Sequence, residues 1–320
     1  MRYTFFPSSS ECIHATVYTY PLEAKPLLSL AYSDAASRCL EACMRPMPKL
    51  VALVAYYPPY LPSTTTSFPL SLDVLIHLGS SQNFGTRYPS HTYPDTQPGF
   101  AESDLEEYDK PAARLSWSRT LGLVRRAFGL YVDLEAIWDN HTELEFAKKD
   151  ADATMKTMVP EPYVNHVPTM TGGIGYRDLR RFYRDFFIPG NPPDMAIKVL
   201  SRTVGSDRVV DEMLCTYTHT KEVPWMLPGV PPTGKKVEVV VVGVICIRGE
   251  KLYHEHIHWD QASVLVQIGL LDPNLVPKGF KTTEAGREKE VKRLPVVGAE
   301  GARKVVDEMV GKSNELIPEW

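Results

Sequence analysis

The 320-residue sequence predicts an α+β protein in which a partial α/β-type parallel sheet is followed by an α+β cone of helices and antiparallel strands. Short apolar runs alternate with helical segments up to about residue 130, which is typical of a parallel sheet. Amphipathic helices then precede a series of strands with a period of two. We therefore expect a truncated α/β domain at 1–130, an α+β cone at 131–272, and a linker with an amphipathic helix at 273–320.

The first part carries apolar runs that predict short buried strands at 26–30, 49–57 and 73–78. Helical segments are expected at 35–44 and 108–128. The links between these elements are rich in Pro, Ser and Thr. They leave little room for a complete doubly wound domain, so this part of the sheet is expected to be incomplete.

The second part opens with an amphipathic helix from Tyr131 to about Glu145 and has another at 177–187, and we interpret their apolar stripes as core. Beyond Pro192-Pro193 only strands are expected, and Gly249-Glu250 forms the turn between the last two. A further amphipathic helix is expected at 301–310. The predicted strands cover 196–204, 208–218, 237–247 and 252–260.

The composition argues against several classes of protein. A net charge of -4 provides no basic surface for a phosphate backbone, so nucleic acid is not an expected partner. The 5 cysteines are odd in number and scattered, which indicates a reducing compartment rather than a disulfide framework. No run of about 18 apolar residues occurs, so we expect a cytoplasmic protein without a membrane span. No cofactor motif was found, and none is expected.

The strand at 252–260 carries His254, His256 and His258 at alternate positions, so one face of the strand holds all three rings. Ring nitrogens on one face can converge on a metal, but no upstream carboxylate stands at metal-ligand spacing, and we expect none. If this face is the interior, Glu255 points outward and the histidines exchange protons with a ligand. If it is exposed, they need no special role.

Asp260 follows Trp259 at the end of this strand and precedes a helical stretch. Beside an indole in a cup of low dielectric, its carboxylate would have a raised pKa and act as a base for enolate chemistry. Its oxygen is equally suited to cap the following helix. Both interpretations stay open, and one residue can serve both.

Residues 131–272 resemble the SnoaL-like polyketide cyclase group of the nuclear-transport-factor-2-like fold. The resemblance rests on PYVNHVP at 162–168, SRTVGSDRVVDE at 201–212, GVPPTGK at 229–235 and the segment 251–271. It implies a cone that closes over one apolar pocket. It also implies a general acid/base at the position of Asp260, for cyclisation or isomerisation of a ketone-type metabolite, and a histidine at the mouth, His166.

Residues 17–128 resemble the C-terminal portion of dienelactone hydrolases (carboxymethylenebutenolidases) of the α/β-hydrolase fold. LLSLAYSDAASRCLEA has the form of a strand, a nucleophile elbow at Ser33 and a helix. The pattern then departs from the family, because Gln82 stands where the acid is expected and Gln97-Pro98-Gly99-Phe100 replaces the histidine motif. His91 precedes the last strand rather than following it. A serine without a base is a weak nucleophile, so we expect Ser33 to be vestigial.

Function is therefore expected in the cone, as the binding of a small apolar or aromatic molecule with Asp260, His166 and His256 as catalytic candidates. The alternatives are an ester or lactone hydrolase and a non-enzymatic binding or dimerisation module. A sheet without its first strands has an exposed edge, which favours a homodimer. The residues expected around the ligand are Tyr163, Tyr217, His254, His258 and Trp259.

The missing acid and base of the hydrolase pattern predict that the purified chain hydrolyses neither a dienelactone nor a simple aryl ester. Ser33→Ala should therefore leave the background rate unchanged. Spectrophotometric assays of the two proteins side by side test this. Turnover that disappears with Ser33 would show that an unrecognised base activates the serine.

Overall fold

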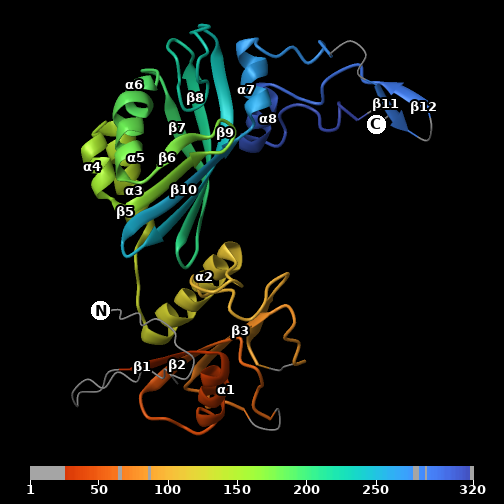
Figure 1. Ribbon diagram of the computed structural model, residues 1–320. Coiled ribbons are helices and arrows are strands. Elements are labelled where there is room, and N and C mark those ends of the chain that lie inside the picture. The colour runs from red at the N-terminus through yellow and green to blue at the C-terminus, as the bar shows by residue number, and fades with distance from the viewer. Residues whose placement is uncertain (1–25, 64–66, 86–87, 277–280, 285–286, 318–320) are drawn as a thin grey trace. The chain divides into compact units, whose positions relative to one another are not determined.

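The structure is a computed structural model that describes residues 26–63, 67–85, 88–276, 281–284 and 287–317 (Figure 1). The chain divides into two compact units, Met1–Val132 and Asp133–Trp320. Cys12 and the rest of the N-terminal segment lie outside the described residues. In the described part of the chain, no helix is both long and apolar enough to cross a membrane.

The first unit contains a four-stranded parallel sheet in the order β1-β2-β3-β4. Leu40 of one helix packs with Leu53, whereas Leu123 of the other packs with the neighbouring strand residue Val54. Successive strand residues point to opposite faces, so a helix covers each face of the sheet. The sequence predicted this parallel sheet correctly, because strands covered on both faces are continuously apolar. The elements are β1 (Leu27–Tyr32), α1 (Ser33–Ala42), β2 (Leu50–Tyr56), β3 (Asp73–Gly79), β4 (Ser90–Tyr93) and α2 (Lys110–Phe128).

The second unit is built on a six-stranded sheet in the order β6-β5-β10-β9-β8-β7. All neighbouring pairs are antiparallel except β5 and β10. Figure 1 shows the sheet curving around the helices α3 to α6, with α7 and α8 beside β9. This is the α+β cone that the sequence predicts. The strands are β5 (Met158–His166), β6 (Thr171–Ile174), β7 (Ala196–Val204), β8 (Arg208–Thr218), β9 (Lys236–Arg248) and β10 (Lys251–Trp259).

The two helical segments predicted near 131–145 and 177–187 are present in this unit. Both continue into π-helical turns, at Glu143–Ala147 and Tyr183–Phe187. The C-terminal helix ends at Val306, earlier than predicted, and it belongs to the second unit. The helices are α3 (Leu134–Thr142), α4 (Ala151–Lys156), α5 (Tyr176–Phe182), α6 (Ile188–Gly190), α7 (Gln261–Ile268) and α8 (Ala299–Val306), and a separate hairpin joins β11 (Lys281–Glu284) to β12 (Arg287–Glu290).

Strands β5 and β6 were not predicted, because helices were expected to precede all the strands. Pro160 and Pro162 within β5, and Gly172 and Gly173 within β6, hide the period-two pattern. The hairpin of β9 and β10, by contrast, was predicted with its turn. Gly249 and Glu250 have φ of 57 and 63, the left-handed conformation that a tight two-residue hairpin turn requires.

Asp260 caps helix α7. Its Oδ1 accepts hydrogen bonds from the backbone N–H groups of Ala262 at 3.0 Å and Ser263 at 3.2 Å. Gly269 ends the helix with a φ of 77. The structure therefore places Asp260 in the capping role that the sequence left open.

We predict that Asp260→Ala lowers the free energy of unfolding by about 1 kcal/mol, whereas Asp260→Asn retains most of the stability, because asparagine is also a good N-cap. Denaturant unfolding of both variants, followed by circular dichroism, provides the measurement. Equal losses for alanine and asparagine would contradict capping as the main role of this side chain.

Candidate functional site

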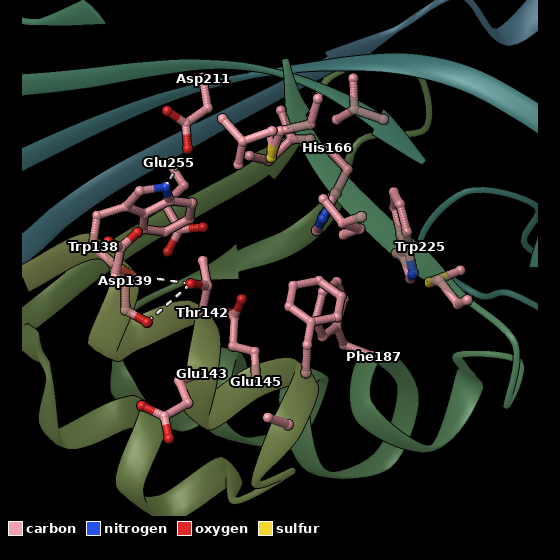
Figure 2. Close-up of a pocket in the computed structure, with 18 of the residues that line it drawn as sticks. Trp138, Asp139, Thr142, Glu143, Glu145, His166, Phe187, Asp211, Trp225 and Glu255 are labelled. Carbon is pink, nitrogen blue, oxygen red and sulfur yellow. Dashed lines mark hydrogen bonds between the residues drawn. The ribbon is translucent and has the colours of Figure 1, made fainter. Parts of the chain in front are cut away.

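A cavity of about 350 Å³ lies in the second unit between the helical layer and the sheet (Figure 2). Its wall is largely apolar, with Met213, Val241 and Ile257 from the sheet. Polar side chains interrupt this wall at a few points, which is the usual composition of a small-molecule site. The aromatic lining residues are Trp138, Phe146, Tyr183, Phe187 and Trp225, and the ionisable ones are Asp139, Glu143, Glu145, His166, Arg202, Asp211 and Glu255.

The two π-helical turns supply part of this wall. The turn after α3 contributes Glu145 and Phe146, and the turn after α5 contributes Tyr183 and Phe187. A π-helical turn inserts an extra residue and so changes which side chains face inward, and such turns are frequent at functional sites. The apolar side chains of these two helical segments therefore form part of the core and part of the cavity wall.

His141 of α3 lies between two buried carboxylates. Its Nε2 is 3.0 Å from Glu145 Oε1 and 3.2 Å from Glu255 Oε1. Its Nδ1 is 2.5 Å from the hydroxyl oxygen of Thr157, which itself donates to the Thr154 carbonyl at 2.7 Å. Because the hydroxyl proton of Thr157 is already used, Nδ1 of His141 must be the donor in that contact.

Burial opposes a charge on His141, but the negative charges of Glu145 and Glu255 outweigh this effect and raise the pKa of His141 to about 10. The ring is therefore an imidazolium at neutral pH and donates through Nε2 to Glu145. One N–H cannot point at two carboxylates. Among the described residues no donor is aligned with Glu255 Oε1, which is buried.

The ligand atoms of His141, Glu145 and Glu255 lie within 4.8 Å of one another, so these side chains could hold a metal ion. A metal would need the lone pair on Nε2 of His141. It would therefore have to displace a proton that is held with a pKa of about 10. A metal at this cluster would therefore compete with that proton, and its binding would weaken as the pH falls.

Glu255 and Tyr183 complete the cluster. Burial raises the pKa of Glu255, and the attraction of His141 offsets this effect only in part. Burial also raises the pKa of the Tyr183 phenol well above its ordinary value, and the charges of Glu145 and Glu255 add to the effect. The cavity wall thus holds a carboxyl group with an increased proton affinity beside a neutral phenol.

His166 of β5 lines the cavity as a buried side chain. Its protonation state is the opposite of that of His141. Burial lowers the pKa of His166 to about 4. Its Nδ1 donates to the carbonyl of Thr171 at 3.2 Å, because a carbonyl oxygen only accepts. Nε2 therefore carries a lone pair. The ring packs against Phe187 and Trp225, with centroids 5.7 and 5.2 Å away.

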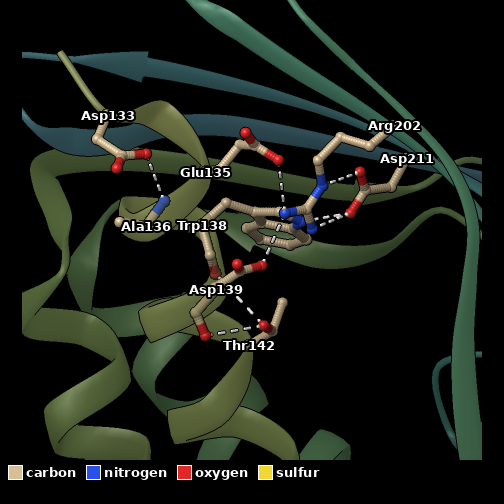
Figure 3. Close-up of polar contacts among 8 residues, drawn as sticks. All are labelled: Asp133, Glu135, Ala136, Trp138, Asp139, Thr142, Arg202 and Asp211. Carbon is tan, nitrogen blue, oxygen red and sulfur yellow. Dashed lines mark hydrogen bonds and ion pairs between the residues drawn. The ribbon is translucent and has the colours of Figure 1, made fainter.

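A second polar cluster lies at another part of the wall (Figure 3). Arg202 of β7 holds Asp211 of β8 through two hydrogen bonds of 2.7 and 2.8 Å. The same guanidinium lies 2.9 Å from Asp139 and 3.6 Å from Glu135. Trp138 donates its indole N–H to Asp211 at 2.8 Å. These carboxylates raise the pKa of Arg202 and leave its charge fully paired.

Strand β10 does not turn its histidines toward the cavity, although one interpretation of the sequence expected this. Glu255 and Ile257 line the cavity, so the alternate residues His254, His256 and His258 point to the outer face of the sheet. There His254 is paired with Tyr163 of β5, and the ring of Tyr163 lies 5.5 Å from that of His256. The structure does not bring these four residues to the cavity.

The remaining predicted residues are also outside the cavity wall. Asp260 is exposed at the start of α7. Trp259 is buried behind the wall, with its ring 5.4 Å from that of Trp225, and its indole N–H donates to Gln261. Tyr217 is buried and donates its hydroxyl to the sulfur of Met226. Of the predicted residues, only His166 lines the cavity.

In the first unit, Ser33 is exposed at the strand-to-helix turn with a φ of 50, the left-handed conformation expected of an elbow. Gln82, at the expected acid position, instead accepts from the N–H of Gly79 and donates to the carbonyl of Pro58. Within the residues that the structure describes, no hydrogen bond joins Ser33 to a base. The expectation of a vestigial nucleophile stays a prediction.

Comparison with known proteins identifies the domain that holds the cavity. Residues 139–255, which lie within the second unit, match the SnoaL-like domain family. No match was found among curated proteins. The match lies within the second unit, and the dienelactone hydrolase resemblance of the first stays a prediction.

Solved structures match less than half of the chain. They include TsrD from Streptomyces laurentii, with 16% identity over 44% of this chain and 100% of that chain and a TM-score of 0.36. A putative polyketide cyclase from Acidithiobacillus ferrooxidans has 24% identity over 42% and 93%, with a TM-score of 0.34. A putative SnoaL-like polyketide cyclase from Jannaschia sp. CCS1 has 19% identity over 42% and 93%, with a TM-score of 0.34.

We predict that the two cavity histidines titrate on opposite sides of the ordinary value of 6.5, His141 at about 10 and His166 at about 4. Because the pKa of His141 is raised on folding, its ion pairs contribute stability below pH 6.5 that is lost as the pH rises through about 10. Nuclear magnetic resonance of histidine-labelled protein measures both values, with His166→Gln for assignment. Titration of both rings near 6.5 would contradict the described cluster.

Proposed function

We propose that the second unit binds a small, largely apolar molecule in the cavity between its helices and its sheet, and exchanges a proton with it through Glu255. The observation that carries this proposal is the position of Glu255. It is a buried carboxyl group in the wall of an otherwise apolar cavity of about 350 Å³. Apolar cavities with a few convergent polar groups and displaced pKa values are typical of small-molecule sites.

The neighbours of Glu255 suit it to this exchange. A general base works best when its pKa lies near the working pH, and burial raises the pKa of Glu255 toward that range. The imidazolium of His141 lies 3.2 Å away and stabilises the ionised carboxylate. His166 is neutral with a free lone pair on Nε2, so it can accept a hydrogen bond from a ligand hydroxyl. The pKa of Glu255 is raised and that of His166 is lowered within the same cavity, which supports different roles for these two residues.

The cyclisation or isomerisation of a ketone-type metabolite is the more specific form of this proposal. Such a reaction needs a carboxylate that removes the proton next to a carbonyl group. Asp260 is exposed and its Oδ1 is occupied by backbone donors of α7, whereas Glu255 faces the cavity. We therefore transfer the proposed role of base from Asp260 to Glu255.

Filling the cavity tests the binding proposal. Val241 lines the cavity, and its neighbour Val242 points to the outer face of the same strand. We expect Val241→Phe to weaken the binding of a neutral apolar probe, N-phenyl-1-naphthylamine, by roughly tenfold or more, because the added ring occupies the ligand volume. Val242→Phe should leave the affinity unchanged.

Fluorescence titration of the probe measures both affinities, and circular dichroism confirms that the variants are folded. Equal effects of the two substitutions would place the bound probe outside this cavity. Absence of binding to the wild-type chain would contradict the proposed function.

A further inference from the structure

Carboxylates outnumber cationic groups around the cavity. The lining residues include Arg202 as the only arginine or lysine, against the carboxylates of Asp139, Glu143, Glu145, Asp211 and Glu255. His141, directly behind the wall, contributes one more positive charge, and Lys148 pairs with Glu143 at 3.1 Å. Paired charges therefore leave a net negative cavity.

Neither the charge of Arg202 nor that of His141 is available to a ligand. Arg202 is held by Asp211 at 2.7 Å and by Asp139 at 2.9 Å, with Glu135 at 3.6 Å. The imidazolium of His141 is held by Glu145 and Glu255. An anionic ligand would meet carboxylates without a free cationic partner in a region of low dielectric, where repulsion is strong. The cavity thus disfavours carboxylate and phosphate ligands.

Glu255 Oε1 is a specific acceptor within this negatively charged cavity. This atom is buried, and among the described residues no hydrogen bond to it is found. The single N–H on Nε2 of His141 points to Glu145, and the Tyr183 phenol lies beside the Glu145 and Glu255 carboxyl groups. A buried acceptor without a donor is costly, and a charged N–H donor gives a stronger hydrogen bond than a neutral one. A ligand ammonium group would satisfy this oxygen and offset the excess negative charge together.

The aromatic wall suits the same group. Trp138 stacks on His141 at a centroid distance of 5.6 Å, and His141 is 3.2 Å from Glu255. Figure 2 shows Trp138 and Glu255 on one side of the cavity and Phe187 and Trp225 on the other. Aromatic rings attract cations through their negative faces and also cover an apolar body.

We propose that the ligand of this cavity is a protonated amine with an apolar body, whose N–H is donated to Glu255 Oε1. This inference rests on the proposed function and names the ligand group that Glu255 recognises. The apolar body packs against the aromatic and aliphatic wall, and the ammonium group lies at the cluster of His141, Glu145 and Glu255.

Three matched ligands test the inference on the wild-type chain by isothermal titration calorimetry. Tryptamine carries the ammonium group, 3-propylindole replaces it by a methyl group, and indole-3-propionate replaces it by a carboxylate. We expect tryptamine to bind roughly ten- to a hundredfold more tightly than 3-propylindole, the range for a hydrogen bond to a charged group, and indole-3-propionate to bind most weakly.

Variants locate the effect. Glu255→Gln should remove most of the advantage of tryptamine over 3-propylindole. Glu212→Gln is the matched control, because Glu212 lies next to Asp211 on β8 but on the outer face, where it accepts a hydrogen bond from Ser201. This control changes the net charge equally and should have no effect.

The outcomes separate this inference from the proposal it rests on. If 3-propylindole binds and tryptamine binds no more tightly, the amine inference is overturned while the binding function stands. If none of the three ligands binds, both are overturned. If Glu255→Gln does not fold, the comparison of the three ligands on the wild-type chain still decides.

Discussion

The cavity depends on one buried imidazolium. His141 belongs to α3, Glu145 to the π-helical turn that follows it, and Glu255 to β10 on the facing sheet, and all three are buried. Removing one member would leave a charge buried without its partner, which is strongly unfavourable in a protein interior. The cluster therefore fixes the helical layer against the sheet and fixes the direction of Glu255.

Trp138 connects this cluster to the second one. Its ring stacks on His141, and its indole N–H donates to Asp211, which pairs with Arg202. Trp138 therefore contacts both polar clusters. Both clusters pair their positive charges internally, which leaves the interior negative and leaves the buried Glu255 Oε1 without an aligned donor among the described residues.

The sequence predicted the cone but not its chemistry. Period-two patterns located β7 to β10, whereas prolines and glycines concealed β5 and β6. In β10 ionisable residues occupy both faces, so alternation alone could not decide whether Glu255 or the histidines point inward. The sequence analysis interpreted the apolar stripe of the helix that carries His141 and Glu145 as core, and both side chains are buried. Their partner Glu255 lies far along the chain, and only the folded sheet brings it beside them. The i, i+4 spacing of His141 and Glu145 on an apolar stripe was the one available signal.

The most direct test of this account is the titration of the Glu255 carboxyl carbon by nuclear magnetic resonance, assigned with the Glu255→Gln spectrum. The account predicts a single carboxyl resonance, absent from that variant, which titrates above the ordinary glutamate value of 4.5 because the side chain is buried in the cavity wall. Titration at or below 4.5 would show that Glu255 is solvated or fully paired. It would then be unsuited to exchange a proton with a ligand.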